Sequence, residues 1–180
     1  MKNKKIIYGI AIILVFTLST TACFGQNNSG GGRTFNNAED LKKYLDSQPA
    51  NSPDKPIKVS MAINDPMFEK VVAVIKSAGK YVSLNITGNA LTTIESDDDW
   101  GVNKTLVSIT IPNSVKSIKG RFIYIGLTSI TFQGTIDEDN FGYNAFPYDL
   151  REKYLAGGPG TYTITTASAN AVYDSTWTKQ

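Results

Sequence analysis

Alternating apolar and polar positions dominate the middle of the chain and predict short strands, each with one buried face. Ile57 to Ile63 and Val82 to Ile86 show this alternation most clearly. One serine-led phrase returns four times, with its serines 23, 25 and 21 residues apart: Ser60-Met61-Ala62-Ile63, Ser83-Leu84-Asn85-Ile86, Ser108-Ile109-Thr110-Ile111 and Ser129-Ile130-Thr131-Phe132. Recurrence at such a period predicts repeats that stack and share one core.

Helical spacing interrupts the strands at a few places. A short helix is predicted around Leu41, Tyr44 and Leu45, with Asn36 or Asn37 as its N-cap. A second helix is predicted between the first two strands, with Asp65 as N-cap and Gly79 just past its end. A strand, a helix and a strand in that order predict parallel strands joined by a right-handed crossover.

The later units replace the helix with short extended pieces. Leu91 to Ile94 and Val115 to Ile118 are such pieces, and Pro112-Asn113-Ser114 forms a turn before the second one. After Pro147 a helix is predicted on which Leu150 and Tyr154 share a face, and a hairpin containing Tyr162, Ile164, Tyr173 and Trp177 follows. Repeats of this kind need covers at both ends, because a terminal repeat has no neighbour to bury its core.

The segments Leu106 to Ile118 and Leu127 to Ile130 closely resemble BspA-like leucine-rich repeats. The tail from Leu150 to Thr163, with Trp177 near the end, resembles the closing segment of small repeat lipoproteins in that group. The resemblance covers roughly residues 57–180. It implies an α/β, strand-rich fold: a short right-handed leucine-rich-repeat-like solenoid with parallel strands, an N-terminal helical cap and a C-terminal cap of helix plus hairpin. Members of this group are typically exposed at the cell surface, and some bind host matrix proteins.

The N-terminus carries the features of a lipoprotein signal. Lys2, Lys4 and Lys5 precede an apolar stretch from Ile6 to Leu18, and small residues lead into Cys23, the single cysteine. The arrangement resembles the bacterial lipobox, although Thr20 stands where leucine is usual. It implies that cleavage exposes Cys23 for attachment of lipid such as palmitate, and that Phe24 directs the protein to an outer membrane or the cell surface. An uncleaved membrane anchor is the alternative, against which the apolar stretch is short of the ~20 residues that a spanning helix needs.

Five segments follow from these patterns. They are a signal peptide at 1–22, a flexible tether at 23–35, an N-terminal helix and linker at 36–56, a leucine-rich-repeat-like solenoid at 57–146 and a C-terminal cap at 147–180. The tether is rich in glycine and asparagine, and its reach is on the order of 15–20 Å. The domain is therefore expected to sit close to the membrane without spanning it, as a monomer.

Composition excludes several classes of chemistry. The chain has 18 Lys+Arg, 16 Asp+Glu and no histidine, and three of the lysines lie in the leader. The rest of the chain therefore has nearly balanced charge and is not expected to bind nucleic acid. Without histidine, and with Cys23 acylated, the usual nucleophile–base pairs and zinc sites are absent, so we expect neither an enzyme nor a cofactor.

Two acidic clusters and one basic group are candidate sites. Asp97-Asp98-Asp99 and Asp137-Glu138-Asp139 lack the spacing that wraps a calcium ion, so exposed acidic loops are the preferred interpretation and no metal site is predicted. Lys116, Lys119 and Arg121 could form an anion patch, although charges on exposed strands more often prevent edge association.

The candidate binding face is the outward row of the repeated phrases. If Met61, Leu84, Ile109 and Ile130 point inward, their polar neighbours share the opposite face of the sheet. These are Ser60, Ser83, Asn85, Ser108, Thr110, Ser129 and Thr131. The function hypothesis is a membrane-anchored cell-surface lipoprotein that binds a protein or glycan in adhesion. The alternative is an envelope structural lipoprotein that binds a component of its own cell.

Overall fold

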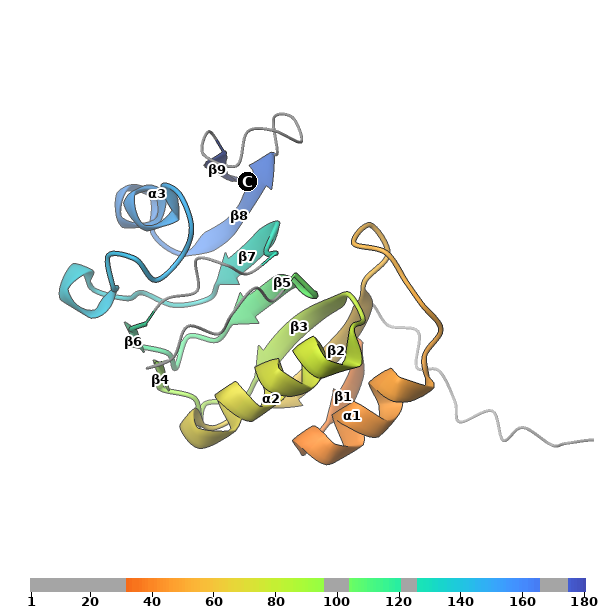
Figure 1. Cartoon of the computed structure of the whole chain (residues 1–180). Helices are drawn as coiled ribbons and strands as arrows, with labels where there is room; N and C mark the ends of the chain where they lie inside the picture. Colours follow the sequence, from red (N-terminus) through yellow and green to blue (C-terminus); the bar gives the residue numbers. More distant parts are fainter. Residues whose placement is uncertain (1–31, 96–103, 121–125, 166–174) are drawn as a thin grey trace, which may run out of the picture.

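A mostly parallel seven-stranded sheet with helices packed on it forms the protein (Figure 1). The computed structural model describes residues 32–95, 104–120, 126–165 and 175–180. The elements in chain order are β1 (Arg33–Phe35), α1 (Ala38–Ser47), β2 (Ile57–Ala62), α2 (Asp65–Ala78), β3 (Val82–Thr87), β4 (Thr93–Ile94), β5 (Leu106–Ile111), β6 (Ser117–Ile118), β7 (Ser129–Phe132), the 3-10 turn η1 (Glu138–Asn140), α3 (Leu150–Gly157), β8 (Gly160–Thr165) and β9 (Thr176–Lys179). The α/β, strand-rich class predicted from the sequence is confirmed.

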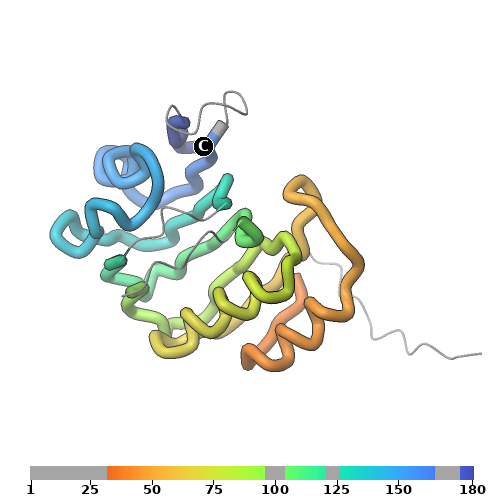
Figure 2. The backbone as a smooth tube through the Cα atoms, in the orientation of Figure 1, coloured from red at the N-terminus to blue at the C-terminus, as the bar shows by residue number. Residues whose placement is uncertain are grey.

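The chain builds the large sheet strand by strand from one edge to the other. Its order is β1-β2-β3-β5-β7-β8-β9, and Figure 2 shows the chain colours passing across it in sequence. Pairings from β1 to β7 are parallel, whereas β8 and β9 are antiparallel additions. The short strands β4 and β6 form a separate parallel pair, and one parallel bridge joins Ile118 to Phe141 beyond it. The C-terminal hairpin is confirmed as β8 and β9, while Tyr173 lies outside the described residues.

The pairing register differs from the serine alignment at one strand. Ser83, Ser108 and Ser129 are direct neighbours on β3, β5 and β7. Ser60, however, pairs with Asn85, and Ser83 pairs with Lys58. The first phrase is therefore displaced by two residues. Because strand side chains alternate with period two, a shift of two leaves every side chain on its expected face.

The inward face of the sheet forms the core. Met61, Leu84, Ile109 and Ile130 are between 0% and 4% exposed, as the sequence predicts. The helices α1 and α2 lie side by side along this face (Figure 1) and bury one stripe each. Burial of one such aliphatic side chain contributes about 1.5–3 kcal/mol, so this shared interior is the main source of stability.

The helix starts follow local capping chemistry. Asn37 is the N-cap of α1, and its Oδ1 accepts a 2.8 Å hydrogen bond from the Asp40 backbone N–H. The predicted N-cap of α2 was wrong by one residue, because Asn64 occupies that position and Asp65 begins the helix. Gly79 ends α2 at φ 60°, a left-handed conformation that glycine adopts without strain.

An aromatic cluster closes the C-terminal end of the sheet. The Phe132 ring lies 4.5 Å from that of Tyr154 on α3 and 6.0 Å from that of Tyr162 on β8. The indole of Trp177 is fully buried and donates a 3.1 Å hydrogen bond to the Pro147 carbonyl. The helix and hairpin therefore cover apolar surface that the last parallel strand would otherwise expose.

The N-terminal edge differs from the expected boundary. Arg33–Phe35 fall within the segment assigned to the tether but pair in parallel with β2 as β1. Three residues are too few to show an alternation in the sequence. Phe35 nevertheless becomes buried against Tyr44 of α1, at a ring distance of 5.1 Å.

Replacing Gly134 by alanine tests the close approach of consecutive turns. Gly134 follows β7, and a Cβ there would lie 2.6 Å from the Asn113 Cα, in the turn after β5. We expect Gly134→Ala to lower the free energy of unfolding by about 1–3 kcal/mol in urea denaturation. The control Thr135→Ala, at the neighbouring exposed residue, should change it by less than about 0.5 kcal/mol. Equal stability of the two variants would contradict this packing.

Candidate functional site

The outward side of the large sheet carries two rows of polar side chains, which we call the polar face. Strand pairing fixes the membership of each row, because directly paired residues point to the same side. One row is Lys58, Ser83, Ser108, Ser129, Thr163 and Thr178. The other is Thr34, Ser60, Asn85, Thr110, Thr131 and Thr161.

All seven residues predicted for the binding face lie on this surface. Six of them are partly exposed, and Ser60 is buried at 6% exposure. Adjacent strands are ~4.8 Å apart, so the polar face presents a regular grid of small groups. Whether this grid binds a ligand stays a prediction.

The row through Ser60 is partly satisfied by its own members. Asn85 Nδ2 donates a 3.3 Å hydrogen bond to Ser60 Oγ, and the hydroxyls of Thr131 and Thr161 share a 2.9 Å hydrogen bond. These bonds tie neighbouring strands together on the outer surface. Removing one of them would therefore disturb the sheet as well as any ligand.

The three neighbouring serines Ser83, Ser108 and Ser129, which we call the serine row, differ from the Ser60 row in their hydrogen bonding. Within the part of the chain that the structure describes, the hydroxyls of Ser83, Ser108 and Ser129 make no hydrogen bond to the protein. All three residues are partly exposed. Their donors and acceptors therefore face water and are free to exchange it for a ligand. They form the part of the polar face best suited to recognition.

The chemistry of the polar face is neutral. Lys58 at one end is the only charged member of the two rows, and the others offer hydroxyls and amides. Such groups both donate and accept hydrogen bonds, which suits the hydroxyls of a glycan or the main chain of a protein. The face provides no pair of carboxylates for acid and base catalysis.

The strand β8 adds residues that the sequence interpretation missed. Thr161 and Thr163 extend the two rows, and Thr178 of β9 follows. Their signal was present as the alternation of threonine with Tyr162 and Ile164. It was assigned to the cap because antiparallel pairing of β8 with β7 was not anticipated.

The remaining predicted groups do not assemble into a site. Lys116 and Lys119 are exposed at the two ends of β6, and Glu138 of the second acidic cluster is exposed and pairs with Arg151 at 3.4 Å. No group of three acidic, cysteine or histidine side chains among the described residues could hold a metal ion. Cys23, Arg121 and Asp97-Asp98-Asp99 lie outside the described residues.

Two tyrosines have raised pKa values because their hydroxyls are buried inside the fold. Burial raises the pKa of Tyr154, whose hydroxyl accepts from the Ile136 N–H at 2.7 Å and donates to the Gly134 carbonyl at 2.9 Å. Burial also raises the pKa of Tyr162, whose hydroxyl donates to the Gly158 carbonyl. Both lie under the C-terminal cap and not on the polar face.

Comparison with known proteins finds no relative of this chain. The chain matches no family model, no curated protein and no solved structure. Of the described helices, none has the length and apolar character needed to cross a membrane.

The carboxylate of Asp65 gives a pH-dependent test of the loop before β4. Backbone N–H groups of Thr92 and Thr93 donate to it at 2.7 and 3.1 Å, and these bonds lower the pKa of Asp65 below 3.8. A lowered folded-state pKa stabilises the protein above the unfolded-state pKa, and this contribution is lost as the pH falls through the folded value.

We therefore expect the stability gap between wild type and Asp65→Asn to be largest above pH 5 and to shrink as the pH falls below about 3.8. Urea denaturation at a series of pH values measures it. Glu69→Gln, on the exposed side of the same helix, is the control and should show no such trend. A gap that is independent of pH would refute the role of the ionised carboxylate.

Proposed function

We propose that this protein is a lipid-anchored cell-surface lipoprotein that binds a protein or glycan ligand through its polar face. In this proposal Cys23 carries the lipid, the segment after it is the tether, and the folded part is a short right-handed leucine-rich-repeat-like solenoid of BspA-like type. The bacterial envelope is the location, at the outer membrane or the cell surface. The protein acts as a monomeric binding module without catalytic activity.

The solenoid interpretation is supported by a second column of parallel pairing. The strands β3, β5 and β7 pair in the large sheet, while β4 and β6 pair separately and Ile118 bridges Phe141 in parallel. Consecutive chain turns therefore contact each other at two places along their length. Stacked coils have this property.

The N-terminal segment 1–22 supports the proposal that the protein is anchored to a membrane. Its basic start, apolar stretch and small residues before Cys23 fit a processed lipoprotein signal. Stable anchoring takes two lipid chains or one chain plus another signal, and each buried methylene contributes about 0.8 kcal/mol. An acylated terminal cysteine supplies enough acyl chain to hold the domain at a membrane.

The observation that carries the binding proposal is the unsatisfied serine row. Ser83, Ser108 and Ser129 are paired strand neighbours, partly exposed, and free of hydrogen bonds to the described protein. A ligand with regularly spaced hydroxyls or amides would replace water there without breaking a protein contact. Binding without catalysis fits a surface whose rows hold a single charged residue.

Substitution of Cys23 tests the anchor. We expect the wild-type protein expressed in a bacterial host to incorporate labelled palmitate and to fractionate with membranes. Cys23→Ser should lose the label, and Phe24→Ser, which leaves the thiol in place, should keep it. A wild-type protein that resists extraction from membranes yet carries no label would instead indicate an uncleaved leader.

A triple alanine variant tests the polar face. We expect Ser83→Ala/Ser108→Ala/Ser129→Ala to unfold within about 1 kcal/mol of wild type, because no protein hydrogen bond is lost. The same variant should lose most of its capture of ligand from extracellular-matrix extract. A control variant replaces Ser52, Ser77 and Thr135, which lie outside the two rows, and should retain capture.

The same pull-down with bacterial envelope extract separates the two classes of partner. Specific capture from the envelope alone, lost in the triple variant, would replace adhesion with the structural-lipoprotein function. Capture that is indifferent to the three serines would overturn the binding role of the polar face.

A further inference from the structure

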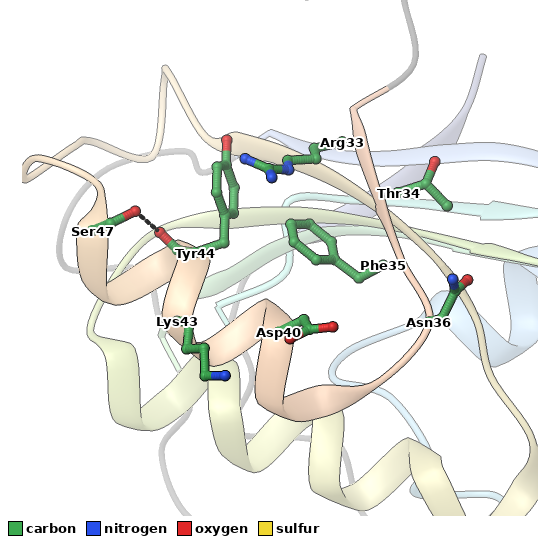
Figure 3. Close-up of a pocket in the computed structure, with 8 residues that line it drawn as sticks. All are labelled: Arg33, Thr34, Phe35, Asn36, Asp40, Lys43, Tyr44 and Ser47. Carbon is green, nitrogen blue, oxygen red and sulfur yellow. Dashed lines mark hydrogen bonds between the residues drawn. The ribbon is translucent and has the colours of Figure 1, made fainter. Parts of the chain in front are cut away.

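A groove runs along the first strand on the side of the sheet that carries the helices. Its volume is about 430 Å³, and residues of β1 and α1 line it (Figure 3). The strand contributes consecutive residues from Arg33 to Asn36. The helix contributes Asp40, Lys43, Tyr44 and Ser47, which share one helix face because they are three, four and seven residues apart. The groove is therefore as long as the strand.

The strand beside this groove is an edge strand. It lies at the end of the sheet order, so among the described residues only β2 pairs with it. The outer backbone N–H and C=O groups of an edge strand can pair with a further extended chain. A strand edge next to a helix face is the arrangement into which peptides bind by strand addition, with main-chain hydrogen bonds giving affinity and side-chain pockets giving specificity.

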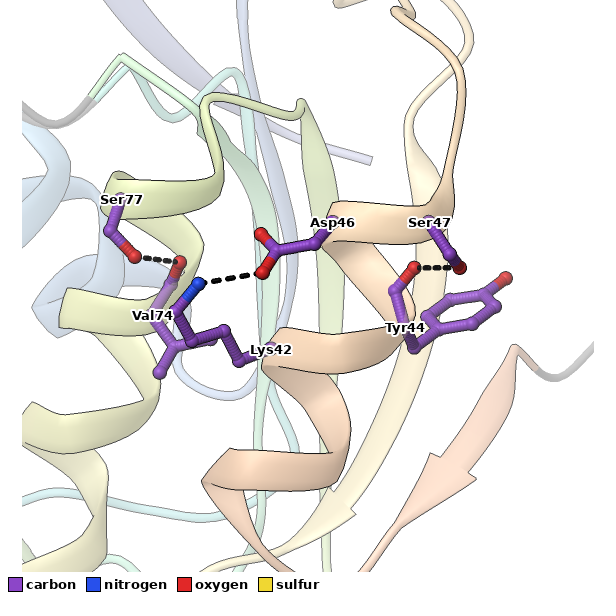
Figure 4. A network of polar contacts seen from close by, with 6 residues as sticks. All are labelled: Lys42, Tyr44, Asp46, Ser47, Val74 and Ser77. Carbon is purple, nitrogen blue, oxygen red and sulfur yellow. Dashed lines mark hydrogen bonds and ion pairs between the residues drawn. The ribbon is translucent and has the colours of Figure 1, made fainter.

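The groove also carries two cations, Arg33 and Lys43, that form no ion pair with any described residue. The Arg33 guanidinium lies 4.9 Å from the Tyr44 ring centre and 5.6 Å from that of Phe35. Within the described part of the chain Arg33 and Lys43 make no ion pair and no hydrogen bond through their side chains. Lys42, the residue before Lys43 on α1, does have an ionic partner. Its ammonium pairs with the Asp46 carboxylate at 2.6 Å (Figure 4).

The aromatic contacts prepare Arg33 for an oxyanion. Rings that hold a guanidinium reduce its freedom before binding, and its N–H groups can still donate to a carboxylate. The one carboxylate lining the groove, that of Asp40, already accepts a 2.9 Å hydrogen bond from Asn37 Nδ2. The groove therefore has an excess of positive charge beside an open strand edge.

We propose that this groove binds an extended acidic peptide segment of another protein, which adds to β1 as a new edge strand and places its carboxylates near Arg33 and Lys43. Thr34 belongs to both this groove and the polar face. The cations of the groove, however, lie on the side of the sheet that carries the helices, whereas Ser83, Ser108 and Ser129 lie on the opposite side. The protein then has one surface for a neutral polar ligand and a second for an acidic strand.

Two other occupants fit the charges less well. The segment 24–31 immediately before the groove contains no acidic residue. A second copy of the chain would bring its own β1, whose Arg33 repeats the positive charge. An acidic peptide from another protein is the occupant that complements both cations.

Fluorescence polarisation with defined peptides tests the proposal on the full chain in detergent micelles. The probe is a labelled heptapeptide in which glutamate alternates with valine, and its analogue carries lysine in place of glutamate. We expect the acidic probe to bind at least about tenfold more tightly than the analogue. Arg33→Ala and Lys43→Ala should each weaken it by about three- to tenfold, whereas Lys116→Ala, just before β6, should leave binding unchanged.

Backbone methylation distinguishes strand addition from simple charge attraction. Two isomers of the acidic probe carry N-methyl groups on alternate residues, so that each isomer has one blocked edge. A strand uses only one edge for pairing, and we expect the isomers to differ by about tenfold or more. Equal binding of both isomers would overturn the proposal.

Two further results would also overturn it. One is unchanged binding in both Arg33→Ala and Lys43→Ala, each shown by its thermal unfolding to be folded. The other is a concentration-dependent dimer, seen by sedimentation without probe and abolished by these substitutions, which would assign the edge to a second copy. The triple serine variant should bind the acidic probe like wild type, so this test is independent of the function proposed for the polar face.

Discussion

The period of two along the parallel strands, interrupted by one register shift between Val82 and Ser83, is the constraint on which the rest of the structure depends. The strands β2, β3, β5 and β7 each turn one set of side chains to the core and the other to the outer face of the sheet. The inward set, which includes Leu84, Ile109 and Ile130, forms the shared interior. The outward set consequently has to be polar, and it lines up because parallel pairing puts equivalent residues beside each other. Core and candidate binding face are two results of one pattern.

The sequence predicted the elements that an apolar period marks and missed a feature that such a period does not determine. The strands, the crossover helix and the inward face were predictable because regularly spaced apolar residues mark each of them. The displaced register of Ser60 was not, since a shift of two residues leaves the hydrophobic pattern unchanged. The strand β1 was missed because three residues carry no period, and its formation depends on Phe35 packing against α1.

Both ends of the sheet show why a short stack of strands needs more than its repeats. At one end Phe132 packs against α3 and β8, and Trp177 is buried below Pro147. At the other end β1 and α1 cover β2, and among the described residues no strand pairs with the outer edge of β1. The aromatic end continues into antiparallel strands, while the N-terminal end finishes in a three-residue strand with charged neighbours, a common protection against edge pairing.

That protection and the proposed peptide groove are two interpretations of the same cations, and the contacts of Arg33 favour binding. A charge that merely deters association needs exposure and no particular orientation. Arg33 is instead held near two aromatic rings, in a groove whose other wall presents Lys43. Orientation of a cation before its partner arrives lowers the entropy lost on binding. In the proposed role, the same edge disfavours another copy of itself and accepts a chain that brings carboxylates.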